Sequence, residues 1–277
     1  MIDLSTLPDI TFLDKPEILR CVFHPRKTEP VETIPERRLP FSLVVEDGIS
    51  IGGIIFIAEK KAPNIIFFHG NGEVASDYIN FGPFFIDYDM NLAVVDFRGY
   101  GTSGGVPTYS AMIKDAHVVF HKLIEHLKEI GLEGPVFVMG RSLGSASALE
   151  IAACYPSQIL GLIVESGFAH TYNLLVRLGV DPDILNPALE ASVSNLEKMK
   201  NVEIPVLFIH GERDVIIPVG DCLDLLEATK NENKGILVIP GAGHNTLMLV
   251  GLKNYMEACV CFIDWAKKYR ANRSKFS

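Results

Sequence analysis

The chain has 277 residues, of which 48% are hydrophobic and 21% charged, a balance typical of a folded globular protein and not of a disordered one. Its net charge of −9 argues against nucleic acid as a partner, because phosphate binding depends on clustered lysine and arginine. The five cysteines follow no disulfide or metal-ligand spacing, so we predict free thiols in a reducing compartment, with Cys154 and Cys222 as small buried side chains.

The first thirty residues lack the basic segment and long apolar segment that together mark a secretory signal. No apolar run approaches the roughly 20 residues of a membrane helix. We therefore predict a cytoplasmic protein without an integral membrane segment. No feature of the sequence indicates the oligomeric state.

Residues 1–40 form an irregular, proline-rich N-terminal extension in which only 16–21 resembles a short helix, and its role stays open. Residues 41–46 and 51–58 then flank Asp47-Gly48, a dipeptide that favours a tight hairpin turn. We expect these two segments to form antiparallel strands at an edge of a sheet.

From residue 65 onward, short apolar runs alternate with segments of helical periodicity. The runs are 65–68, 92–95, 136–139, 160–164, 206–209 and 236–239, and the helical segments are 73–88 (interrupted near Gly82), 110–130, 142–154, 218–229 and 254–269, the last with Trp265 facing inward. Continuous apolar runs are typical of strands buried on both faces. The alternation predicts an α/β fold: a mostly parallel eight-stranded sheet with helices on both faces, in a single domain spanning residues 1–277.

Residues 170–203 break this alternation, since they follow a strand but contain no compact helix–strand unit. Insertions of this length over an active face are often lids. We predict a small lid whose apolar residues form an acyl pocket. The alternative is a longer crossover with one helix over 188–199.

The segment Gly140-Arg141-Ser142-Leu143-Gly144 lies between a predicted strand and a predicted helix. A serine flanked by glycines at this spacing is typical of a nucleophile elbow, where the turn is too sharp for neighbouring side chains. The helix that follows directs its free N–H groups at the serine. The pattern therefore predicts that Ser142 is a nucleophile.

A serine nucleophile needs a base, and the strongest of eight histidines is His244, in a glycine-flanked loop after the last strand. His69 and His210 also end strands, where a histidine more often shapes a turn. His117 and His121 lie one helical turn apart, but no further metal ligand is evident, so we expect a solvated helix face and no metal site.

The base in turn needs a carboxylate, for which Asp214 is the preferred residue because it directly follows the penultimate strand region. Glu165 is the rival and Glu212 a weaker one. The order Ser142, Asp214, His244 is the chain order of an α/β-hydrolase triad.

A developing oxyanion needs two hydrogen-bond donors. We predict the backbone N–H groups of Leu143 and Asn71, with Gly70 and Gly72 as alternates that also line the substrate site together with Arg141. The alternative is that residues 69–72 form an ordinary tight turn.

A further glycine-rich loop, residues 96–103, lacks the spacing of a phosphate-binding or dinucleotide-binding motif, so we predict a structural loop braced by Asp96 and Arg98. No cofactor is therefore expected.

Five motifs occur in a fixed order: His-Gly-Asn-Gly-Glu, Asp-Phe-Arg-Gly-Tyr-Gly, Gly-Arg-Ser-Leu-Gly, His-Gly-Glu-Arg-Asp and Gly-Ala-Gly-His. Over about residues 41–268 the chain resembles serine hydrolases of the α/β-hydrolase superfamily, and most of all the small-capped branch that includes protein depalmitoylases and many bacterial hydrolases. The resemblance implies Ser142 as nucleophile, Asp214 as acid and His244 as base.

We accordingly expect a metal-free and cofactor-free serine hydrolase that cleaves an ester or thioester of a small-molecule or acylated substrate through an acyl-enzyme. Two alternatives stay open. One is an aminopeptidase-type peptidase in which Glu165 anchors the substrate amine, and the other is a ligand-binding protein on a hydrolase scaffold.

Overall fold

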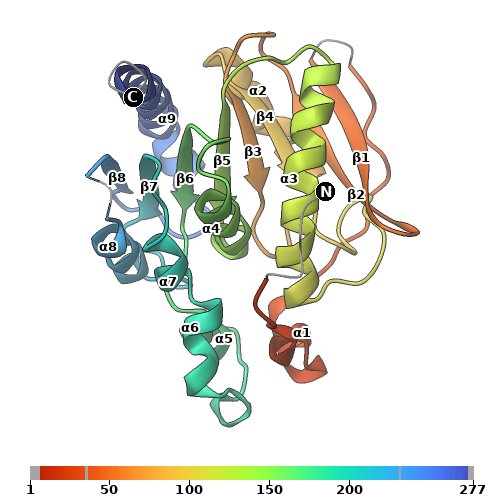
Figure 1. Ribbon diagram of the computed structural model, residues 1–277, viewed down its shortest axis with the longest axis vertical. Helices are drawn as coiled ribbons and strands as arrows, with labels where there is room; N and C mark the ends of the chain where they lie inside the picture. Colours follow the sequence, from red (N-terminus) through yellow and green to blue (C-terminus); the bar gives the residue numbers. More distant parts are fainter. Residues whose placement is uncertain (1–6, 35–36, 231, 274–277) are drawn as a thin grey trace.

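The computed structural model describes residues 7–34, 37–230 and 232–273, and its centre is one eight-stranded sheet (Figure 1). The strands are β1 (Arg38–Glu46), β2 (Ile49–Phe56), β3 (Asn64–Phe68), β4 (Asn91–Val95), β5 (Val136–Arg141), β6 (Gly161–Glu165), β7 (Val206–Gly211) and β8 (Lys234–Ile239). They are ordered β1-β2-β4-β3-β5-β6-β7-β8. Strand β2 is antiparallel to both of its neighbours, β1 and β4, and the six strands β3 to β8 are mutually parallel, which confirms the predicted fold.

Helices cover both faces of the sheet. The α-helices of the described residues are α1 (Pro16–Val22), α2 (Gly82–Asp87), α3 (Tyr109–Glu129), α4 (Ser145–Cys154), α5 (Thr171–Arg177), α6 (Glu190–Val193), α7 (Asn195–Met199), α8 (Val219–Ala228) and α9 (Leu247–Arg273). Helices α3, α4 and α8 pack into one apolar core, and α2 and α9 into the other. Strands β3, β4 and β6 are buried along their whole length between these layers, which explains their continuous apolar runs.

Glycines lie at the breaks in two predicted helices, of which the break near Gly82 was predicted and the bend at Gly251 was not. The segment 73–88 divides into a 3₁₀ helix, Ala75–Asn80, and α2, and Gly82 at the junction lies so close to the Phe56 ring that a Cβ would be 2.4 Å from it. The last helix begins earlier than predicted and bends at Gly251, where a Cβ would be 2.7 Å from Ile239. Trp265 was predicted to face inward but is 37% exposed, because its helix position lies at the border of the buried stripe.

All five cysteines are free thiols, as predicted. Cys222 is buried, whereas Cys154 is exposed at the end of α4, contrary to the prediction. None of the described helices is both long and apolar enough to cross a membrane.

The segment predicted as a lid lies beyond the carboxyl ends of the strands, at the same end of the molecule as α1 (Figure 1). It contains α5, α6 and α7, and the single helix predicted for 188–199 is interrupted by the extended residue Ser194. Its side chains Leu174, Leu175 and Val193 are buried in the core, so they pack against the body of the protein. Lys15 donates a hydrogen bond to Ile184 O, which joins the N-terminal segment to this insertion. A lid function stays a prediction.

Candidate active site

Ser142 lies at the junction between β5 and the helical turn Ser142–Gly144 that leads into α4. Its φ of +51° lies in the left-handed region, which a non-glycine residue adopts at an energetic cost. The flanking glycines are required by close packing: a Cβ on Gly140 would be 2.5 Å from Gly144 O, and one on Gly144 would be 2.1 Å from Phe68 O. The structure thus has the predicted elbow geometry at this position.

Three side chains that are distant in sequence meet at the carboxyl end of the sheet. His244 Nε2 lies 3.0 Å from Ser142 Oγ, and His244 Nδ1 lies 2.7 Å from Asp214 Oδ2. All three residues are buried. With Nδ1–H donating to the carboxylate, Nε2 is free to accept the serine proton.

The Asp214 carboxylate is held by its own loop. Its Oδ1 accepts hydrogen bonds from the N–H groups of Ile216 (3.0 Å) and Ile217 (2.8 Å), which leaves Oδ2 directed at His244. Burial by itself would raise the pKa of Asp214, but the contacts with His210 and His244 outweigh it and lower that pKa below its usual range. Asp214 is therefore an anion at neutral pH.

Comparisons with known proteins agree with this architecture. A family model described as serine aminopeptidase S33 matches residues 59–173. The chain is 29% identical to human alpha/beta hydrolase domain-containing protein 17B and 26% identical to protein bem46 of Schizosaccharomyces pombe. These matches cover 72% and 69% of this chain. The chain spans slightly less than two thirds of these relatives' own length, 66% and 64% respectively.

Among solved structures, an esterase of Pyrococcus furiosus, Pf2001, superimposes with a TM-score of 0.70 at 20% identity, over 87% of this chain and 98% of that one. A bacterial membrane phospholipase A superimposes with a TM-score of 0.62 at 17% identity, covering 83% and 87%. These likenesses show a shared fold. The family-model match, the curated relatives and the solved structures together support an α/β-hydrolase superfamily member.

The two rival carboxylates have other partners. Glu165 Oε1 accepts from Arg141 Nε (3.0 Å) and Glu165 Oε2 from Tyr255 Oη (2.7 Å). Burial raises the pKa of Glu165 despite the opposing charge of Arg141. The exposed Glu212 accepts from Gly241 N–H. The geometry thus favours Asp214 as the partner of His244.

Arg141, predicted to contact substrate, lines the cavity beside His244 and also joins parts of the protein to one another. Its guanidinium pairs with Glu165 and Glu73, and its Nη2 donates to His244 O and Asn245 Oδ1, both at 2.8 Å. These contacts hold the His244 loop, and substrate contact by Arg141 stays a prediction. Sequence reasoning missed the role of Arg141 in holding this loop, because the loop lies more than 100 residues away.

The loop predicted to supply the second oxyanion donor contains one N–H group that is already engaged. Gly70 N–H donates to Glu73 Oε2 at 2.7 Å, which rules it out as a free donor and leaves Asn71 and Gly72. Gly72 has a φ of +75°, a conformation that favours glycine. Leu143 is buried directly after Ser142. The donor roles of Asn71 and Leu143, and substrate contact by Gly72, stay predictions.

The N-terminal extension, which had no predicted role, supports this loop. His24 N–H donates to Asn71 Oδ1 (3.1 Å) and to Tyr100 Oη (2.8 Å), and Tyr100 Oη also donates to Asn71 Oδ1. Arg26 Nε donates to Gly72 O. No sequence pattern marks these contacts of the extension, because they join residues 46 to 76 positions apart.

A cavity of about 190 Å³ lies beside His244. Most of its apolar wall comes from α2, α9, the 3₁₀ helix before α2 and two central strands: Phe67, Tyr78, Phe81, Phe85, Met139, Leu247, Met248, Leu249 and Tyr255. The segment 170–203 contributes no residue to it, so for this cavity the prediction of a pocket formed by the insertion is wrong. The reason is that the buried apolar side chains of the insertion pack into the core.

Proposed function

We propose that the protein is a serine hydrolase that cleaves a carboxylic ester or thioester through an acyl-enzyme. The observation that carries this proposal is the continuous series of contacts from Ser142 Oγ to His244 and on to Asp214. A hydroxyl is a weak nucleophile at neutral pH and requires such a base. The esterase and phospholipase folds among the relatives support the same reaction class.

In the proposed reaction, Ser142 Oγ attacks the substrate carbonyl carbon while its proton passes to His244 Nε2. The oxyanion that forms accepts hydrogen bonds from the N–H groups of Leu143 and Asn71. Its collapse breaks the bond to the alcohol or thiol, which receives the proton from His244 and leaves. Water, deprotonated by His244, then attacks the acyl-enzyme and regenerates the Ser142 hydroxyl. Asp214 stays ionised throughout and stabilises the imidazolium.

The cavity beside His244 supports a preference for a small apolar substituent on the substrate. Its volume of about 190 Å³ is below the range of about 300–1,000 Å³ typical of drug-sized ligands. Two ester series separate the possible occupants: one varies the acyl chain with a fixed p-nitrophenol, and the other varies the alcohol with a fixed acyl group. Met248→Trp, which fills the cavity, should lower kcat/KM for longer chains in only one of the two series. The affected series identifies whether the acyl chain or the alcohol occupies the cavity. Equal effects on all chain lengths would contradict the assignment.

An aminopeptidase-type activity is the second candidate, favoured by the description of the matching family model. Such an activity needs a free carboxylate for the substrate amine, and both oxygens of Glu165 already accept hydrogen bonds from the protein. We therefore expect ester turnover to exceed turnover of aminoacyl amides. A higher kcat/KM for aminoacyl amides than for esters would reverse this order.

The direct test of the proposal is to trap the acyl-enzyme. After brief reaction with p-nitrophenyl butyrate and quenching in acid, mass spectrometry should find a butyryl group on the peptide that contains Ser142. The Ser142→Ala protein should carry none. Hydrolysis that proceeds equally in Ser142→Ala would contradict the proposal, and slow single turnover with retained product would instead indicate a ligand-binding protein.

A further inference from the structure

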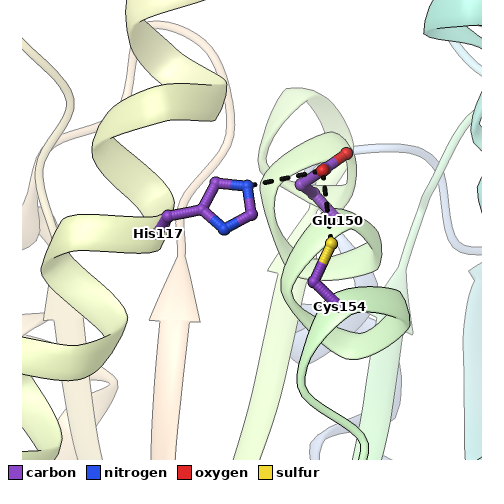
Figure 2. Close-up of side chains that lie close together, drawn as sticks. All are labelled: His117, Glu150 and Cys154. Carbon is purple, nitrogen blue, oxygen red and sulfur yellow. Dashed lines mark hydrogen bonds and ion pairs between the residues drawn. The ribbon is translucent and has the colours of Figure 1, made fainter. Parts of the chain in front are cut away.

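A second group of reactive side chains lies between α3 and α4, apart from the triad (Figure 2). His117 extends from α3, and Glu150 and Cys154 extend from consecutive turns of α4. His117 Nε2 lies 3.4 Å from Glu150 Oε1, and Cys154 Sγ lies 3.6 Å from the same oxygen. All three potential ligand atoms lie within 4.8 Å of one another.

The His117 ring is oriented as metal-binding histidines are. Its side chain is only 2% exposed, so the solvated helix face predicted for this residue is wrong. Nδ1 lies 2.7 Å from Tyr155 Oη, whereas Nε2 forms no hydrogen bond and points at Glu150. With Nδ1–H donating to Tyr155, Nε2 keeps a free lone pair directed into the cluster.

The two oxygens of Glu150 have separate partners. Oε2 is bound by Lys198 Nζ at 2.9 Å, which fixes the carboxylate, while Oε1 faces both His117 and Cys154. An outer partner that orients a ligating carboxylate is a regular feature of metal sites. Cys154 is exposed, so an ion has access from solvent.

We propose that His117 Nε2, Glu150 Oε1 and Cys154 Sγ bind a divalent transition-metal ion of the zinc class, with water as the fourth ligand. Tetrahedral zinc with ordinary bond lengths separates its nitrogen and oxygen ligands by about 3.4 Å, and its oxygen and sulfur ligands by about 3.6 Å. The structure has these two separations before any ion is added. The third pair, His117 Nε2 and Cys154 Sγ, lies within 4.8 Å.

The ligand types exclude hard cations. Magnesium and calcium prefer all-oxygen ligands, whereas a set of imidazole, carboxylate and thiolate suits zinc, cobalt and related ions. On binding, the thiol releases its proton to solvent, and the thiolate and carboxylate together balance the charge of the ion. The bound ion joins α3 to α4 and should therefore raise the melting temperature.

The experiment titrates the purified protein with Co²⁺ and with Zn²⁺. Co²⁺ should produce one equivalent of a thiolate-to-cobalt absorption band that Zn²⁺ displaces, and Zn²⁺ should raise Tm. Cys154→Ser should abolish the band, and His117→Gln should weaken binding at least tenfold. Cys261→Ser, which removes another exposed thiol, is the matched control and should bind as the wild type does. Tyr155→Phe keeps all ligands and should weaken binding about tenfold.

A Co²⁺ band that is absent in the wild type, or that persists in Cys154→Ser, would overturn the metal site and leave an ion-pair network between the helices. Binding equal in wild type and His117→Gln would do the same, provided that circular dichroism shows both proteins folded. Because Cys154→Ser leaves the triad intact, its esterase activity should equal that of the wild type, and the two proposals therefore fail independently.

Discussion

Two groups of side chains near opposite ends of α4 each combine a histidine, a carboxylate and a nucleophilic atom. In the first, His244 lies between Ser142 and Asp214. In the second, the carboxylate of Glu150 lies between His117 and Cys154. The order of contact decides the chemistry, because an imidazole touching the hydroxyl can accept its proton, whereas a carboxylate touching the thiol opposes formation of the thiolate.

The surroundings of the two nucleophilic atoms lead to the same contrast: negative charge is stabilised at Ser142 and disfavoured at Cys154. Ser142 precedes α4, where the free N–H groups of the helix stabilise negative charge. Cys154 is the last residue of that helix, and partial desolvation of its sulfur, reinforced by the charge of Glu150, raises the pKa of its thiol to about 11. The first group is therefore suited to nucleophilic attack and the second to binding a cation.

The largest effect should come from removing the nucleophile or base of the first group. We expect Ser142→Ala and His244→Ala each to lower kcat for ester hydrolysis by about 10⁴ or more. Cys154→Ser should retain full activity, since Cys154 lies outside the triad. Steady-state kinetics with p-nitrophenyl butyrate measure all three, and a loss in Cys154→Ser as large as that in Ser142→Ala would erase the distinction.

Three carboxylates can be compared by the same kind of substitution. Asp214→Asn should lower kcat on the order of 10⁴-fold, because the amide no longer orients or balances the imidazolium. Glu165→Gln and Glu150→Gln should remain active. A nearly inactive Glu165→Gln together with an active Asp214→Asn would exchange the two assignments.

The low pKa of Asp214 predicts the pH dependence of ester hydrolysis. The carboxylate stays ionised well below the ordinary aspartate value of about 3.9, so its protonation contributes no acid limb to kcat/KM between pH 5 and 8. Replacing Glu165 should leave the wild-type pH profile in place. A shift of the acid limb of kcat/KM in Glu165→Gln would contradict this expectation, because it would show that Glu165 controls the acid limb.

A smaller effect concerns the reactivity of Cys154. A rise of its pKa from 9.0 to about 11 lowers the thiolate fraction at neutral pH by about 100-fold, and alkylation by iodoacetamide should slow accordingly. The rate should rise about tenfold per pH unit from pH 7 to 9 and should increase in Glu150→Gln. Mass spectrometry measures the alkylation rate of Cys154 in the folded protein, and the rate of the same cysteine in denaturant serves as the reference. Equal rates in folded and denatured protein would contradict the assigned surroundings.

The smallest effect is on stability. Lys198→Met leaves the largely buried carboxylate of Glu150 without its cation and should lower the free energy of unfolding by about 1–3 kcal/mol at pH 7. The folded-state pKa of Glu150 is lowered: burial would raise it, but Lys198 and His117 outweigh burial. This contribution is therefore present above the ordinary glutamate pKa and is lost as the pH falls below it. Urea unfolding should show a smaller difference in the free energy of unfolding between wild type and Lys198→Met at pH 3 than at pH 7. An equal difference at both pH values would contradict this prediction.

The fold and the triad could be predicted because their signals are local. Ser142, Asp214 and His244 each follow an apolar run within a few residues, and the ends of parallel strands meet at one edge of a sheet. The prediction for Trp265 was wrong because this residue lies at the edge of the apolar stripe of its helix, where hydrophobic periodicity distinguishes buried from exposed positions least well.

The second group was missed because its members come from two helices. His117 follows Ile113 by four residues and precedes Phe120 by three, so it lies on the apolar stripe of α3, and that signal for burial was present. Nothing local indicated that Glu150 and Cys154 would face it. The contacts of His24 and Arg141 likewise depend on segments brought together only by the fold.

The most direct measurement of the central claim is peptide mapping after reaction with a fluorophosphonate. We expect one stoichiometric adduct on Ser142 in the wild type, none in Ser142→Ala, and unchanged labelling in Cys154→Ser. Labelling that persists unchanged in Ser142→Ala would contradict the assignment of Ser142 as the nucleophile.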